Sequence, residues 1–134
     1  MPQLNNGNGY SAEWLCIRSL CKIIRKWFTS VLARHGVRGR GYGICSNAIS
    51  RGLQGASVKT LRKLKGLDQN ANVRDHASFA ELVAWTLAEI LGGVRILKQN
   101  SHGNAQCAAV CYDTAKHVAQ MADALLGNST SEAP

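Results

Sequence analysis

The sequence predicts an all-α protein: a compact bundle of about five helices, three long and two short, with no sheet. Apolar residues recur at intervals of three and four along most of the chain, the spacing of a helix that buries one face. Serine stands where several of these segments begin and glycine where they end, as is typical of helix caps. No segment shows the alternation of polar and apolar residues that predicts a strand.

The chain of 134 residues, 46% of them hydrophobic, is long enough for one domain with an ordinary core. We expect a single helical domain over residues 11–126, between a flexible head (1–10) and a flexible tail (127–134). The head is polar and rich in Gly and Asn, so no secretory signal is expected. No segment approaches the roughly 18 uninterrupted apolar residues that cross a bilayer. These features predict a cytoplasmic protein with no membrane partner.

The first predicted helix follows Ser11, a candidate N-cap, and ends near Gly36. An apolar stripe runs along one side of it, and basic residues occupy the opposite side. We favour a face that packs inside the protein over a coiled-coil seam, because the stripe covers only about three heptads. The stripe comprises Trp14, Ile17, Cys21, Ile24, Phe28 and Val31, and the basic side comprises Arg18, Lys22, Arg25 and Lys26.

Residues 37–43 read VRGRGYG, and three glycines in seven residues predict a loop with positive φ angles. This loop would hold Arg38 and Arg40 beside Tyr42, an arrangement suited to a phosphate group or an acidic surface. A plain connector between two helices is an equal alternative.

Two short helices are expected next, over residues 44–53 and 58–65. Ser57 caps the second and Gly66 stops it. The tripeptide GAS between them resembles the turn of a helix-turn-helix DNA-binding motif. The first helix fits this motif less well, because Arg51 stands where a small residue is usual. The second helix is expected to expose Lys59, Thr60, Arg62 and Lys63.

Residues 67–77 are polar and predict an irregular segment. Ser78 and Glu81 then form an S-x-x-E capping box, which opens a long amphipathic helix. The apolar stripe of this helix comprises Phe79, Leu82, Val83, Leu87, Ile90, Leu91, Val94 and Leu97. Gly92 and Gly93 lie within this helix, where they weaken it and permit another helix to approach closely.

A turn over residues 100–104 leads into the last helix, about residues 105–126. Small residues along this helix favour tight packing. Its inward side chains are expected to be Cys107, Cys111, Val118, Met121, Ala122 and Leu125. We expect one core to contain Trp14, Phe28, Phe79, Leu87, Ile90 and Val118.

The charge of the chain is concentrated in its first half. Residues 1–66 carry twelve Lys and Arg residues but one acid, Glu13, and are therefore +11, whereas residues 67–134 are −3. This asymmetry predicts a cationic surface facing an anionic partner, either a nucleic acid or an acidic protein. The expected partner-binding residues are Arg38, Arg40, Tyr42, Lys59, Arg62, Lys63 and Lys65.

No enzymatic activity, cofactor or metal is expected. Carboxylates are few, the four histidines lack a nucleophile or carboxylate at suggestive spacing, and no phosphate-cradling loop is present. The five cysteines form no CxxC pair, and Cys16, Cys21, Cys107 and Cys111 are expected to be buried as small hydrophobic residues. The only candidates for a zinc cluster follow one helix in an order that does not close a tetrahedral site. They are His102, Cys107, Cys111 and His117.

Two runs in the middle of the chain carry a resemblance to a known family: CSNAISRGLQGASVKTLRKLKGL from Cys45, and NANVRDHAS from Asn70. They resemble a domain of phage and prophage regulators, the BRO/KilA-type antirepressors and the related DNA-damage-inducible protein D. The likeness covers residues 37–98. Ser50 and Gln54 depart from the family pattern, which has a tyrosine and an aromatic residue at these positions. The family's usual N-terminal DNA-binding domain is not expected here.

The resemblance implies a regulatory protein in the cytoplasm of a bacterial host cell, which binds a repressor-like protein and relieves repression. The alternatives are a helix-turn-helix-like DNA-binding regulator and an inhibitor of a host defence or recombination enzyme, and a homo-oligomer is left open. A structural role is expected for Asn47, Asn72, Arg74 and Asp75. We expect Arg74 and Asp75 to bond loop carbonyls and amides ahead of the helix that Ser78 opens.

Overall fold

The computed structural model describes residues 10–127, which form five α-helices and one 3-10 helix without a β-strand. The all-α bundle is therefore confirmed. Residues 1–9 of the predicted head and 128–134 of the predicted tail lie outside the described residues. No helix in the described part is both long and apolar enough to span a membrane. The elements are α1 (Ala12–Arg34), α2 (Gly41–Gln54), α3 (Val58–Leu64), η1 (Val73–His76), α4 (Phe79–Gln99) and α5 (Gly103–Leu126).

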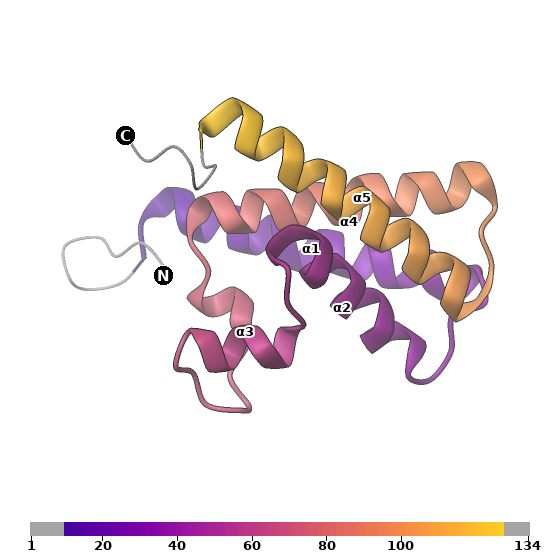
Figure 1. The fold of residues 1–134 in the computed structure, drawn as a ribbon, viewed down its shortest axis with the longest axis horizontal. Coiled ribbons are helices and arrows are strands. Elements are labelled where there is room, and N and C mark those ends of the chain that lie inside the picture. The colour runs from indigo at the N-terminus through magenta and orange to yellow at the C-terminus, as the bar shows by residue number, and fades with distance from the viewer. Residues whose placement is uncertain (1–9, 128–134) are drawn as a thin grey trace.

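Two helix pairs build the bundle, and α4 joins them. α1 packs along α4, α2 packs along α5, and α4 also contacts α5 (Figure 1). α3 and η1 lie beside one end of the α1–α4 pair, where α1 begins and α5 ends (Figure 1). This arrangement leaves α3 projecting from the bundle with most of one side exposed.

The predicted caps are confirmed at three helices. The Oγ atoms of Ser11 and Ser57 each accept a hydrogen bond from the backbone N–H three residues further on, at 3.1 and 3.3 Å. Ser78 and Glu81 make both hydrogen bonds of the capping box, at 3.1 and 2.9 Å. Each serine therefore satisfies a backbone donor that the first helical turn leaves unpaired.

α2 begins at Gly41, three residues earlier than predicted, so Gly41 and Gly43 are helical. The loop before α2 is fastened by Asn104 of α5. The backbone N–H of Arg38 donates to Asn104 Oδ1 at 3.0 Å, and Asn104 Nδ2 donates to the Arg38 carbonyl at 3.3 Å. A Cβ atom on Gly41 would overlap the Asn104 side chain. Glycine at this position therefore permits close contact inside a helix, and a positive φ is confined to Gly36 and Gly39 around the loop.

The buried side of α4 overlaps its predicted stripe only in part, because the helix packs against both α1 and α5. Val83 and Leu91 are exposed, whereas Trp85 and Glu89 are buried. The expected close approach at the glycine pair is confirmed. A Cβ atom on Gly93 would lie 2.6 Å from Cη2 of Trp27 on α1.

The buried residues of α5 extend only as far as Val118. Cys107, Cys111 and Val118 are buried as predicted, but Met121 and Leu125 are exposed. The expectation for these last turns was wrong because the end of α5 lines open grooves beside α2 and α4.

The expectation of one core was also wrong, because the buried apolar residues form two clusters. The larger contains Phe28 and Val118, with Leu87 packed against it, and the smaller contains Trp14, with Phe79 packed against it. Ile90 is half-buried and belongs to neither cluster. Along α1 the polar stretch around Arg25 lies between Cys21 of the smaller cluster and Phe28 of the larger.

Candidate functional site

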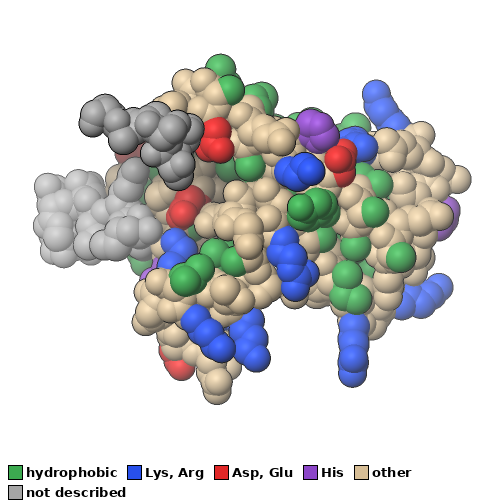
Figure 2. Space-filling model, in the orientation of Figure 1, with side chains coloured by type: hydrophobic (Ala, Val, Ile, Leu, Met, Phe, Trp, Pro, Cys, Tyr) green, Lys and Arg blue, Asp and Glu red, His purple; other side chains and the backbone are tan. Residues whose placement is uncertain are grey.

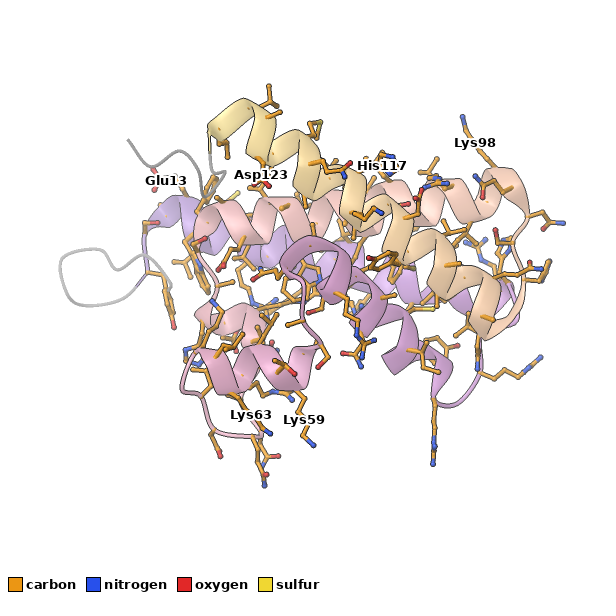
Figure 3. All side chains as sticks on the ribbon, viewed as in Figure 1. Glu13, Lys59, Lys63, Lys98, His117 and Asp123 are labelled. Carbon is orange, nitrogen blue, oxygen red and sulfur yellow. The ribbon has the colours of Figure 1, made fainter. Side chains whose placement is uncertain are left out.

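Four of the predicted partner-binding residues are exposed basic side chains. Arg38 and Arg40 lie on the loop before α2, and Lys59 and Lys63 lie on α3. Lys59 and Lys63 point away from the rest of the molecule (Figure 3). None of the four forms an ion pair with another residue of the 10–127 segment.

The other three predicted binding residues are engaged with the protein itself, and the expected exposure of Arg62 was wrong. Arg62 Nε donates to the Ala71 carbonyl at 2.8 Å, which draws the half-buried side chain inward. Lys65 Nζ lies 3.4 Å from Oε1 of Glu81. Burial raises the pKa of Glu81, but the Ser78 N–H and the Lys65 charge outweigh this and lower it. Tyr42 packs against the larger cluster.

The structure does not bring the loop arginines together with α3. α2, with its 14 residues, lies between them and spans about 21 Å. Basic side chains nonetheless spread along the lower part of the molecule, over α3 and toward the start of α2 (Figure 2). We call this surface the basic edge, and it consists of Arg38, Arg40, Arg51, Lys59 and Lys63.

Side-chain hydrogen bonds fix the turn between α2 and α3. Asn47 Oδ1 accepts from the Val58 N–H at 3.1 Å, and Ser50 Oγ donates to the Ala56 carbonyl at 2.6 Å. Gly55 closes α2 in the left-handed region, at a φ of +74°. Ser50 is fully buried, so this departure from the family pattern supplies a turn-fixing hydroxyl.

Arg74 and Asp75 bond side chains of distant helices, whereas the sequence predicted bonds to loop carbonyls and amides. Arg74 Nη2 donates to Oε2 of Glu89 on α4 at 2.8 Å, and Arg18 Nε of α1 donates to Asp75 Oδ1 at 2.9 Å. Asn72 alone acts locally, since its Oδ1 accepts from the Arg74 N–H at 3.0 Å. This segment therefore ties η1 to both α1 and α4.

Glu89 is the fully buried centre of this network. Its Oε2 accepts from Arg25 Nη1 and from Arg74 Nη2, each at 2.8 Å. Arg74 Nη1 also lies 3.1 Å from the Sγ atom of Cys21. Burial lowers the pKa of Arg74, but the Glu89 carboxylate outweighs this and raises it above its ordinary value. Arg74 therefore stays charged although its side chain is largely removed from water.

The network borders a cleft of about 610 Å³ between α1, α3 and the segment before η1. Five basic side chains line it, and the indole of Trp85 contributes to its wall. Nε1 of Trp85 is buried and has no hydrogen-bond partner among the described residues. The basic residues of the cleft are Arg18, Lys22, Arg25, Arg62 and Arg74.

Sequence reasoning missed this cleft, although one signal pointed to it. Arg18, Lys22 and Arg25 recur at intervals of four and three, which places them on one side of α1. That side was predicted to be opposite the core, but Arg18 is buried and Arg25 half-buried. Its covering elements, α3 and η1, come from residues far along the chain, which helical periodicity does not reveal.

The cysteines are free thiols, and four of them are buried. Cys16 is exposed, contrary to expectation, and Cys45 is buried. The contact with Cys45, together with burial, raises the pKa of Cys111. In the described part of the chain, no three His, Cys, Asp or Glu side chains gather closely enough to hold a metal ion.

Comparison with known proteins finds no family model that matches the chain and no curated protein with significant similarity.

Proposed function

We propose that this protein is a non-catalytic regulator of the phage antirepressor type, which binds an acidic surface of a regulatory protein through the basic edge. The observation that carries this proposal is the set of exposed basic side chains without ion pairs in the described part of the chain. Like charges on one surface repel each other, and an acidic partner relieves that repulsion.

The resemblance of residues 37–98 to the antirepressor domain supports a regulatory role. Asn47 and Asn72 belong to the shared pattern, and both hold turns in the structure. The pattern thus coincides with hydrogen bonds that position α3 and η1, the elements beside the basic edge.

Exposed apolar side chains on the same elements favour a protein partner. Leu64 of α3 is 74% exposed next to Lys63, and Ile44 of α2 is 46% exposed one turn after Arg40. Protein interfaces combine apolar anchors with basic residues, whereas contacts to nucleic-acid phosphates need the basic groups alone.

A nucleic acid is the second candidate, favoured by the geometry of α2, the Gly55 turn and α3. This succession is similar to a helix-turn-helix, with Lys59 and Lys63 on the outer side of the second helix. Arg62 and Lys65 are drawn inward, however, which leaves few groups on α3 for phosphate contacts.

Charge reversal of the basic edge tests the proposal. The double variant Arg40→Glu, Lys63→Glu is compared with Lys26→Glu, Lys98→Glu, which makes the same change in net charge at exposed positions elsewhere. In thermal melts followed by circular dichroism, the free energy of unfolding of both variants should lie within about half a kcal/mol per substitution of the wild-type value. Exposed charges contribute little to stability. Only the basic-edge variant should fail to capture a partner of fixed stoichiometry from nuclease-treated host extract.

The remaining outcomes distinguish the two candidates. Binding to duplex DNA that weakens steeply with salt, with a salt slope reduced by about two in the basic-edge variant, would favour the nucleic acid. Undiminished capture by the Arg40→Glu, Lys63→Glu variant would show that the basic edge is only a solvated surface, and would overturn the proposal.

A further inference from the structure

The cleft beside Glu89 has more positive charge than its own carboxylates neutralise. Glu89 is shared by Arg25 and Arg74, and Asp75 pairs with Arg18. Lys22 is exposed at the rim and has no ion pair within the described residues, and the ordered contact of Arg62 is to a backbone carbonyl. Two carboxylates therefore pair with three of the five basic side chains that line the cleft, and no acidic residue is among its lining residues, so the cleft attracts anions.

Hydrogen-bond donors in the cleft also outnumber the acceptors that meet them. Arg18 and Arg62 each use Nε in the bonds described above, and their terminal Nη atoms donate to no acceptor in the described part of the protein. The buried Nε1–H of Trp85 is a further donor without an acceptor. A buried donor without an acceptor is unfavourable, and a ligand oxygen removes that cost.

The shape of the cleft suits a small molecule. Its volume of about 610 Å³ lies within the range of small-molecule sites. Arg25 and Arg74 are held in place by Glu89, and the Arg74 guanidinium also lies over the Trp85 ring, 4.8 Å from its centroid. Arg18 and Arg62 are likewise held, by Asp75 and by the Ala71 carbonyl, so these cations are positioned before a ligand arrives, which reduces the entropy lost on binding.

We propose that this cleft binds the phosphate group of a small phosphorylated ligand, with Lys22, Arg18 and Arg62 as the donors to its oxygens. A phosphomonoester carries close to two negative charges at neutral pH and three oxygens that accept strong hydrogen bonds. Guanidinium groups match such oxygens in pairs, since their planar donors are spaced for bidentate contact. The site is separate from the basic edge and does not depend on the proposed function.

Isothermal titration calorimetry of the full chain tests the proposal, with inorganic phosphate and adenosine monophosphate as probes and sodium chloride of equal ionic strength as the reference. Lys22→Glu places a negative charge at the rim, and Lys26→Glu is its matched control one turn further along α1, at an exposed residue outside the cleft. We expect at least one probe to bind wild type and Lys26→Glu alike, and Lys22→Glu to bind it about tenfold more weakly or worse.

A second variant and a spectroscopic measurement locate the site. Arg62→Gln should also weaken binding, whereas Arg40→Glu, Lys63→Glu should change it less than twofold. In NMR spectra of the indole groups, the probe should shift the Trp85 Nε1–H signal. The Trp14 signal should stay in place, because its Nε1–H already donates to the Ala77 carbonyl at 2.8 Å.

Three results would overturn the proposal. The first is the absence of binding by either probe beyond the chloride reference. The second is equal weakening by Lys22→Glu and Lys26→Glu, which would indicate attraction by net charge alone. The third is binding to a single-stranded oligonucleotide but to neither small probe, which would make the cleft part of a nucleic-acid surface.

Discussion

Glu89 has no exposed surface, yet two arginines of different elements depend on its charge. Arg25 comes from α1 and Arg74 from η1, so a single carboxylate links three parts of the chain. An ion pair of this kind adds little over an apolar core when complete, but removal of one partner leaves buried charge uncompensated. The stability of the bundle should therefore be sensitive to this one residue.

We expect Glu89→Gln to lower the free energy of unfolding by about 3 kcal/mol, because the variant leaves Arg25 and Arg74 close together without a counter-charge. Urea denaturation followed by circular dichroism measures the loss. Glu13→Gln is the control, because Glu13 is exposed in the first turn of α1. This substitution should lower the free energy of unfolding by well under about 1 kcal/mol. An equally small loss for Glu89→Gln would contradict the structural role given to the network.

At the scale of the element, two glycines of α2 allow the effect of helix propensity on stability to be separated from the effect of packing. Gly43 and Gly52 both lie in this helix, and neither has a positive φ. A Cβ atom on Gly43 would meet no atom within 4 Å, whereas one on Gly52 would lie 2.7 Å from both Ala115 Cβ and the Tyr112 carbonyl oxygen of α5. The same substitution should therefore have opposite effects at the two positions.

We expect Gly43→Ala to stabilise the protein by about 0.5–1 kcal/mol, because alanine has less backbone freedom to lose than glycine. Gly52→Ala should destabilise it by about 1–3 kcal/mol, because the backbone of α5 cannot yield as a flexible side chain would. Thermal melts of the two variants provide the comparison. If Gly52→Ala left the stability unchanged, α2 and α5 would be able to move apart without a loss of stability, contrary to this expectation.

The elements that the sequence predicted well are those with local signals. Ser57 and Ser78 mark helix starts by their own hydrogen bonds, so sequence alone located them. The start of α2 was misplaced because Gly41 is helical through contact with Asn104, more than sixty residues away. The end of α5 was misjudged for a similar reason, since the exposure of Leu125 depends on where neighbouring helices stop.

At the scale of the whole molecule, the candidate sites also divide into those with local sequence signals and those that depend on residues far apart in the chain. Lys59 and Lys63 could be predicted as exposed, because a short helix with a serine cap defines its outer side. The cleft could not, since Arg18 and Arg74 come from segments that only the tertiary fold brings together. The scarcity of acids in the first half of the chain predicts an anionic partner, but it does not predict where on the surface such a partner would bind.

The two apolar clusters raise the question of whether the molecule unfolds in one step. α1 contributes Trp14 to the smaller cluster and Phe28 to the larger, and α4 contributes Leu82 and Ile96 in the same way. Because both helices run through both clusters, neither cluster can lose its helices without disrupting the other. A chain of this size is also within the range where cooperative unfolding is usual.

We therefore expect a single unfolding transition, which tryptophan fluorescence can test in each cluster. A variant with Trp27→Phe and Trp85→Phe retains Trp14 in the smaller cluster, and one with Trp14→Phe and Trp27→Phe retains Trp85 in the larger. In each variant the urea midpoint from fluorescence should equal the midpoint from far-UV circular dichroism. If Trp14 fluorescence changed at lower urea than the helical signal, the end of the molecule that carries α3 would unfold separately, and the basic edge would not be held by the whole bundle.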